Sequence, residues 1–236
     1  MMRLNFIALC LLAPAVAFAQ ADSGRPGTVF FVEGDVFLKD APVTINPALL
    51  PEVRDGQRLR TEQGNAEMLF ALGSFIRLGA DSEVEMVDAG LSSATVRLHR
   101  GAVIVEAFRT WGGDSLQVLV GDSKVCISEP GEMRIAADPH SVEVLSGAVV
   151  VTSAGEEYKV KKKQSATLGP NGVQTAKIKG FAEDALTSWH EQRVKTVLAE
   201  TPKSERRKSG PAADRDGERP FGLGELPDRS QAGIGN

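Results

Sequence analysis

The chain has 236 residues and a formal net charge of −4, and 42% of its residues are hydrophobic but only 6% aromatic. A weakly negative chain has no electrostatic attraction for nucleic acid, so we expect no nucleic-acid partner. The scarcity of aromatic residues also weakens models in which sugars or bases stack on a row of rings.

The N-terminus has the pattern of a secretory signal peptide. Arg3 supplies a positive charge, the apolar run Phe6–Val16 follows, and Ala17-Phe18-Ala19 fits a small-residue cleavage site. The run is shorter than the roughly 20 apolar residues that span a bilayer. We therefore expect a signal peptide over residues 1–19, a linker over 20–27, and a periplasmic or secreted protein with no membrane span. The oligomeric state stays open.

The two cysteines predict no intramolecular disulfide in the exported chain. Cys10 lies within the expected signal peptide, which leaves Cys126 alone. Cys126 lies in the apolar run Lys-Val-Cys-Ile-Ser. We expect it to be a buried small hydrophobic residue rather than a reactive thiol.

Residues 28–179 have the pattern of an all-β domain. Short runs of Val, Ile, Leu and Phe alternate with polar residues and are interrupted by Gly, Asp-Ser or Pro-Gly about every eight to twelve residues. This spacing predicts a β-solenoid-like or sandwich-like architecture. The Pro-containing segment Lys39–Gly56 is expected to be a loop. We expect strands at Thr28–Val32, Gly34–Leu38, Ala66–Phe70, Phe75–Leu78, Glu83–Val87, Thr95–His99, Ala102–Phe108, Leu116–Val120, Lys124–Ser128, Glu132–Ala136, Ser141–Leu145, Ala148–Thr152, Glu157–Val160, Gln164–Leu168 and Val173–Ile178.

One short pattern recurs three times. Gly34, Gly101 and Gly147 each follow one apolar run and precede another, of the form Gly-(Ala/Asp)-Val-x-(Val/Leu). The intervals are 67 and then 46 residues, so the chain has no regular solenoid period. A glycine between two strands allows the backbone to turn a corner without a Cβ clash. We interpret these three glycines as structural.

The C-terminal region changes character. Residues 181–200 carry Leu186, Trp189 and Val194 at helical spacing, which predicts one amphipathic helix that packs onto the β domain or a partner. Residues 201–236 are rich in charged residues, Gly and Pro and poor in large apolar ones. Such a segment buries too little surface to offset chain entropy, so we expect a disordered tail.

The residues that could carry chemistry do not form a known catalytic or metal-binding set. Gly113-Asp114-Ser115-Leu116 matches a tetrapeptide of one class of serine hydrolases, but strands follow it and no His has the required spacing. His99, His140 and His190 are the only histidines, and no pair has metal-ligand spacing. We expect no enzymatic activity, no catalytic residues, no cofactor and no metal.

Two groups of residues are candidates for interaction. Lys159, Lys161 and Lys163 would share one face of a strand, either as a solvated edge or as a patch for anionic polymers or lipid headgroups. Trp189 and Arg193 are candidates on the predicted helix.

Several stretches resemble FecR-like domains. The stretch Val53–Leu69 is similar to their G-x-x-L-x-T-x-x-G-x-A-x-L stretch. The stretch Leu72–Val84 is similar to their following G-S-x-x-R-L-x-x-x-S-x-V stretch. The segments at Gly101 and Gly147 resemble their later x-x-G-x-V segments, and Trp189 with Arg193 resembles the later part of exported stand-alone members. The resemblance covers about residues 28–152 and implies a periplasmic domain used for protein or ligand contacts, with no catalytic residues.

Three functions remain open at this point. The first is a non-enzymatic exported module that binds a protein or ligand in the bacterial envelope, with an envelope protein as its partner. The second is a structural protein that associates with a cell-wall polymer or glycan. The third is a component that acts in trans in a FecR-type envelope signalling system, since we expect neither the family's cytoplasmic segment nor its membrane segment in this chain.

Overall fold

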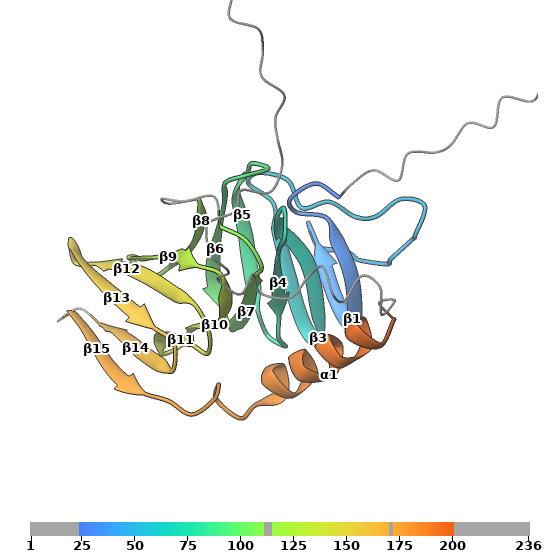
Figure 1. Cartoon of the computed structure of the whole chain (residues 1–236). Coiled ribbons are helices and arrows are strands. Elements are labelled where there is room, and N and C mark those ends of the chain that lie inside the picture. The colour runs from blue at the N-terminus through green and yellow to red at the C-terminus, as the bar shows by residue number, and fades with distance from the viewer. Residues whose placement is uncertain (1–23, 111–114, 170–171, 201–236) are drawn as a thin grey trace, which may run out of the picture. The chain divides into compact units, whose positions relative to one another are not determined.

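The computed structural model describes residues 24–110, 115–169 and 172–200 (Figure 1). The described residues up to Arg193 belong to one compact unit, and Val194 begins a second. The elements are β1 (Val29–Leu38), β2 (Ala41–Pro42), β3 (Arg58–Ala71), β4 (Ser74–Leu78), β5 (Glu83–Ala89), β6 (Ala94–Arg100), β7 (Ala102–Ala107), β8 (Leu116–Val120), β9 (Ser123–Glu129), β10 (Gly131–Ala137), β11 (His140–Val144), β12 (Ala148–Ser153), β13 (Glu156–Lys161), β14 (Gln164–Gly169), β15 (Gly172–Lys177) and α1 (Ala185–Glu200). The prediction of an all-β fold is confirmed.

The strands form one sheet that bends at β3. The strand order is β13-β12-β9-β8-β6-β5-β3-β4-β7-β10-β11-β14-β15, and off this path β1 pairs with β3 and β2 pairs with β1. The first residues of β3 pair with β5 through Arg58–Arg60, while its last residues pair with β4 through Ala66–Ala71. The strands on the β5 side of β3 form one arm of the sheet, and those on the β4 side form the other.

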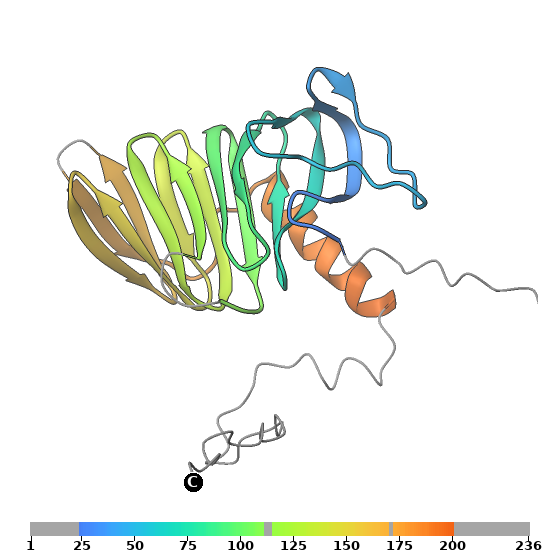
Figure 2. The ribbon, with the colours of Figure 1, turned by 90° about the horizontal axis from the view of Figure 1, so that it is seen from above.

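The chain passes repeatedly from one arm to the other. After β5 and β6 in the first arm it enters β7 in the second, returns for β8 and β9, crosses again for β10 and β11, returns for β12 and β13, and ends in β14 and β15. Figure 2 shows that these hairpins follow one another in chain order, from β1 in blue to β15 in orange. The fold therefore combines two facing layers, as in a sandwich, with the stepwise winding of a solenoid.

Period-two alternation places the core between the arms. In β8, residues Leu116, Val118 and Val120 are buried, while the residues between them are partly exposed. Buried side chains from both arms join one hydrophobic cluster, which includes Met86 and Leu98 from the first arm and Ile76 and Ile135 from the second. Alternate residues of each strand thus fill the core, and the intervening ones line the outer faces.

The recurring glycines lie where the backbone turns sharply. Gly101 follows β6 with φ of +76°, and Gly147 precedes β12 with φ of +78°. A Cβ on Gly101 would lie 2.6 Å from the Cα of Ser82, and one on Gly147 would lie 2.3 Å from the carbonyl oxygen of Pro130. We call each segment in which the chain passes from one arm to the other a crossing. Each of these two glycines therefore has a left-handed conformation and lies against the backbone of a neighbouring crossing. Gly34, with φ of +68°, lies within β1 beside a register shift against β3.

Several element boundaries differ from the sequence-based expectations. β3 begins at Arg58 rather than at Ala66, because residues 58–65 pair with β1 and β5. Its Leu59 and Thr61 are fully buried although the neighbouring side chains are polar. The two strands expected on either side of Gly34 are one irregular strand, β1. The expected loop 39–56 contains the two-residue strand β2 and the fully buried Val53.

The helix begins at Ala185, four residues later than expected from the apolar spacing. Asp184 precedes it, and its Oδ1 accepts a hydrogen bond of 2.8 Å from the amide of Thr187. This is N-cap geometry, which satisfies an amide that has no partner within the helix. Three expected segments lie outside the described residues: the signal peptide (residues 1–19), the first half of the linker (20–23) and the tail (201–236).

We predict that Gly101→Val and Gly147→Val each lower the free energy of unfolding by about 3 kcal/mol or more, because each adds a strained φ to a backbone clash. Gly180→Val is the matched control, since Gly180 lacks a positive φ and has no atom near its would-be Cβ. Chemical denaturation measures all three. Equal free energies of unfolding for Gly101→Val and the control would contradict the close backbone contact at Gly101.

Candidate functional site

A buried ionic cluster lies on the outer face of the second arm. Its centre is Arg77 of β4, which is only 3% exposed. The Nε of Arg77 donates to Glu67 of β3 at 2.7 Å, and its Nη1 donates to Glu106 of β7 at 2.6 Å. The ionic cluster thus joins three adjacent strands through one guanidinium, whose fork suits two carboxylates.

The helix completes this cluster. The Nδ1 of His190 lies 3.1 Å from Nη1 of Arg77, and Nη2 of Arg193 lies 3.3 Å from the second oxygen of Glu67. The two arginines balance the two glutamates in charge. Burial of such charges is tolerated only when they are paired and hydrogen-bonded, so the docked helix is a structural part of the cluster.

Apolar and aromatic contacts hold the same part of the helix. The Arg193 guanidinium lies 4.1 Å from the ring centroid of Phe31, and Trp189 lies 6.2 Å from that ring. The Trp189 indole also donates to Glu33 at 2.9 Å. Leu186 and Ile104 belong to a second small hydrophobic cluster. Trp189 and Arg193, predicted as interaction residues, therefore contact the β body.

The environment of the helix shifts the pKa values of His190 and Asp184. Desolvation, with the charge of Arg77, lowers the pKa of His190 from 6.5 to about 4. His190 is thus neutral at pH 7, and its Nδ1 accepts from Arg77. Burial acts to raise the pKa of Asp184, but the Thr187 amide and Arg134 outweigh it and lower that pKa.

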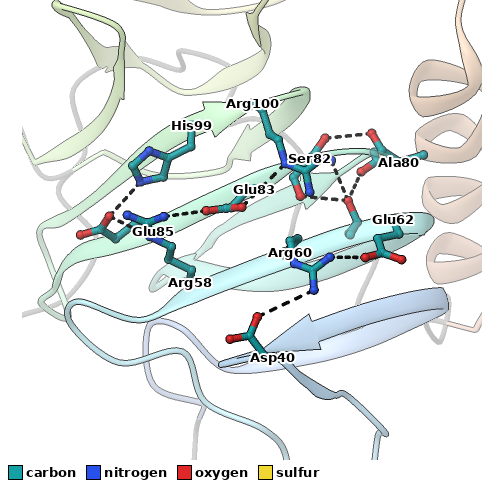
Figure 3. A network of polar contacts seen from close by, with 12 residues as sticks. Asp40, Arg58, Arg60, Glu62, Ala80, Ser82, Glu83, Glu85, His99 and Arg100 are labelled. Carbon is teal, nitrogen blue, oxygen red and sulfur yellow. Dashed lines mark hydrogen bonds and ion pairs between the residues drawn. The ribbon is translucent and has the colours of Figure 1, made fainter.

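An exposed network of charges lies on the outer face of the first arm (Figure 3). Arg58 donates to Glu83 at 2.9 Å and lies 3.4 Å from Glu85. His99 contacts Glu85 at 2.8 Å, and this hydrogen bond is the main cause that lowers the pKa of Glu85. Such exposed pairs contribute little stability each. They present a surface of mixed charge.

A shallow hollow of about 410 Å³ adjoins this network. Arg60 lies on one side of it, with its guanidinium 4.6 Å from the ring of Phe37 and with Asp40 and Glu62 as ionic partners. Most cations of the hollow are thus already compensated by carboxylates. Its lining residues are Phe37, Lys39, Asp40, Gly56, Gln57, Arg58, Arg60 and Glu83.

Three large apolar side chains are exposed on adjoining segments at one end of the strands. Leu72 lies in the β3–β4 turn, Leu91 in the β5–β6 turn, and Phe108 just beyond β7, and they are 38%, 57% and 58% exposed. The Leu72 amide donates to the Leu91 carbonyl at 3.4 Å, and the Phe108 amide donates to the Gly73 carbonyl at 2.9 Å. We call these three residues the apolar cluster.

A row of phenylalanine rings continues the apolar cluster along the outer face. The centroids of Phe108 and Phe75 lie 6.5 Å apart, and those of Phe75 and Phe30 lie 6.2 Å apart, both in edge-to-face geometry. Phe75 of β4 is directly opposite Glu106 of β7. The aromatic row therefore lies beside the ionic cluster.

The three candidate lysines do not share a strand face. Lys159 and Lys161 lie at alternate positions of β13, and Lys159 pairs with Glu129 at 2.9 Å. β13 ends at Lys161, so Lys163 lies in the following turn with φ of +61°. Lys163 therefore does not share the strand face of Lys159 and Lys161, because the chain reverses there to pair β14 with β11 and β15.

This turn gathers other lysines, however. The Lys163 carbonyl accepts from the Ile178 amide at 3.0 Å, and Lys177 is opposite Gln164. We call this group of lysines the lysine end, and it consists of Lys161, Lys162, Lys163, Lys177 and Lys179. None of these five has an ion-pair partner among the described residues.

Ser115 and the histidines lie in separate places. Ser115 is buried next to β8 in the first arm, where its carbonyl accepts from Ala94 at 2.7 Å. His190 is buried against the outer face of the second arm. Gly113 and Asp114 lie outside the described residues. The described part of the chain contains no grouping of three or more metal-ligating side chains, and no helix there has the length and apolar character to cross a membrane.

Arg77, Glu67, Glu106 and Phe108 were not singled out from the sequence as site residues. The three charged residues could have been recognised from their positions, because each interrupts an otherwise apolar run, as in Val103-Ile104-Val105-Glu106-Ala107. A charge in such a strand requires a partner when it is buried. The partners come from strands and a helix far apart in the chain, which the local pattern does not specify.

Comparisons with known proteins give a coarse likeness only. No family model matches the chain, and no curated protein matches it. Two similar crystal structures are each described as "a putative anti-sigma factor from Parabacteroides distasonis ATCC 8503". One is 12% identical with a TM-score of 0.41 and covers 50% of this chain and 58% of that chain. The other is 13% identical with a TM-score of 0.42 and covers 60% of this chain and 64% of that chain.

The chain therefore spans less than two thirds of either solved chain. A likeness at this level assigns neither family nor function. The FecR-like resemblance stays a prediction from the sequence motifs.

We predict that Arg77→Leu lowers the free energy of unfolding by about 3–5 kcal/mol, because it leaves Glu67 and Glu106 buried with one cation fewer. Arg58→Leu removes an exposed arginine and is expected to change stability by less than about 1 kcal/mol. Adding Glu106→Gln to Arg77→Leu leaves Arg193 paired with Glu67 and should recover part of the loss. No recovery in this double variant would contradict a charge-balance role. An equal loss of stability in Arg58→Leu would contradict the importance of burial.

We predict that stability falls between pH 6.5 and pH 4 through His190. In this window the unfolded chain binds a proton that the folded chain excludes, since the folded pKa is about 4 and the ordinary value is 6.5. The stability that depends on neutral His190 is fully present above pH 6.5, and about 3 kcal/mol of the free energy of unfolding is lost by pH 4. The difference between wild type and His190→Gln in urea titrations isolates it from other groups. Parallel pH profiles would contradict the buried, neutral state of His190.

Proposed function

We propose that the chain is a non-enzymatic, exported module of the bacterial envelope that binds another protein through the apolar cluster. Single exposed apolar residues are ordinary on protein surfaces. Here Leu72, Leu91 and Phe108 come from adjoining segments joined by backbone hydrogen bonds, and phenylalanine rings extend the surface. Several exposed apolar side chains on adjoining segments are typical of protein interaction sites. This observation carries the proposal.

The surroundings of the apolar cluster support a binding role. The turns that present it connect strands of one continuous sheet, so they are held by a rigid scaffold. Enzymatic roles receive no support from the placed residues, because Ser115 is buried in one arm while His190 is engaged by Arg77 on the other. Export rests on the signal-peptide pattern of residues 1–19. A partner within a FecR-type signalling system acting in trans is a narrower form of the proposal, supported by sequence resemblance alone.

A capture experiment tests this function. The tagged mature chain is incubated with envelope extracts and compared with the variant Leu72→Ser/Leu91→Ser/Phe108→Ser. The matched control is Leu49→Ser, which removes a leucine that is 77% exposed in another segment. We expect a specific partner that wild type and the control retain and the triple variant loses. Absence of any specific partner, or equal capture by the triple variant, would contradict the proposal.

A second candidate function is association with an anionic cell-wall polymer through the lysine end. The observation that favours it is the grouping of Lys161, Lys163 and Lys177 around one turn without ion-pair partners among the described residues. Unpaired lysines on an edge also prevent strand-to-strand aggregation, which is the simpler explanation.

Co-sedimentation with purified peptidoglycan at low salt tests this candidate. We expect sedimentation that Lys161→Glu/Lys163→Glu abolishes and that Lys195→Glu, a change on the helix, preserves. No sedimentation of the wild-type chain, or sedimentation unaffected by Lys161→Glu/Lys163→Glu, would rule the candidate out.

A further inference from the structure

The apolar cluster is continuous with a pair of facing glutamates. Phe108 follows Glu106 by two residues, just beyond the end of β7, and its ring lies 6.5 Å from that of Phe75, which is directly opposite Glu106. On the neighbouring strand β10, Glu132 is directly opposite Glu106. We call Glu106 and Glu132 the acidic pair. Phe108, Phe75 and the acidic pair thus form one strip beside the docked helix.

The two glutamates differ in how they are compensated. Arg77 donates to Glu106 at 2.6 Å, and Glu106 is 8% exposed. Glu132 has no side-chain hydrogen bond or ion pair within the described residues, and it is partly exposed. Burial, followed by the charge of Glu106, raises the pKa of Glu132. Like charges directly opposite each other on adjacent strands are unfavourable. Arg77 acts in the opposite direction on this pKa, but its guanidinium is paired with Glu67 and Glu106, which leaves Glu132 as the carboxylate of the pair that a cation from a partner can reach.

We propose that the apolar cluster and the acidic pair together bind a protein segment that carries a large apolar side chain close to a lysine or arginine. This inference rests on the proposed function and adds the chemistry of the partner. The apolar side chain packs against Phe108 and Leu72, and the basic group pairs with Glu132. Charge complementarity selects a basic segment, because a cation relieves the repulsion within the acidic pair.

The strip also predicts the spacing within the partner. Glu132 is one strand away from Glu106, and Phe108 follows Glu106 by two residues, just beyond the end of β7. Strand separations of about 4.8 Å and a rise of about 3.3 Å per residue place the two sites roughly 8 Å apart. In an extended segment this distance corresponds to apolar and basic residues about two or three positions apart.

The first experiment selects peptides from a displayed library of random 12-residue sequences against the full mature chain at neutral pH. We expect enrichment of Phe, Leu or Trp with Lys or Arg two or three residues away. For an enriched peptide, fluorescence anisotropy should show loss of binding to Leu72→Ser/Leu91→Ser/Phe108→Ser. Glu132→Gln should weaken binding about tenfold, because it removes a charge-assisted contact. Glu157→Gln, an exposed position on β13, is the control and should leave binding unchanged.

A double-mutant cycle separates direct pairing from structural effects. Replacing the peptide's basic residue with norleucine should weaken binding to wild type about tenfold but leave binding to Glu132→Gln nearly unchanged. Additive effects of the two changes would overturn the pairing. Enriched peptides that need the apolar cluster but have no basic residue would overturn this inference and leave the proposed function intact. If no peptide is enriched, the inference also fails, while capture from envelope extracts decides the proposed function separately.

Discussion

The fold depends on the close approach of backbone segments where the chain crosses between the two arms of its sheet. At Gly101 the chain passes against Ser82, and at Gly147 it passes against Pro130. Both crossings need a left-handed residue with no side chain. Because the crossings pack directly on one another, successive hairpins alternate between the arms and share one hydrophobic core.

This alternation determines what the outer faces can do. The strands of the second arm bring Glu67, Arg77 and Glu106 side by side although they lie far apart in the sequence. The helix then covers them with His190 and Arg193. Trp189 and Arg193, the helix residues predicted to bind a partner, therefore contact the β body instead. The adjoining strip, with Phe75, Phe108 and Glu132, is left accessible, and for this reason it is the better candidate for recognition.

The sequence predicted the architecture better than the site. Period-two patterns at β8 and the recurring Gly-Ala-Val segments located most strands and the crossings, because these depend on neighbouring residues. The start of β3 was missed, since its polar residues are paired by distant strands rather than marked by apolar alternation. The ionic cluster was missed for the same reason. Trp189 was recognised as important, but only the structure shows which surface it contacts.

We propose that protein recognition occurs at the strip. Site-specific photo-crosslinking tests this most directly, with a photoreactive phenylalanine analogue at position 108 or, for comparison, at the exposed position 49. In envelope extracts, position 108 is predicted to give a discrete crosslinked product that Glu132→Gln reduces, while position 49 gives none. Equal crosslinking from the two positions, or none from position 108, would contradict the account.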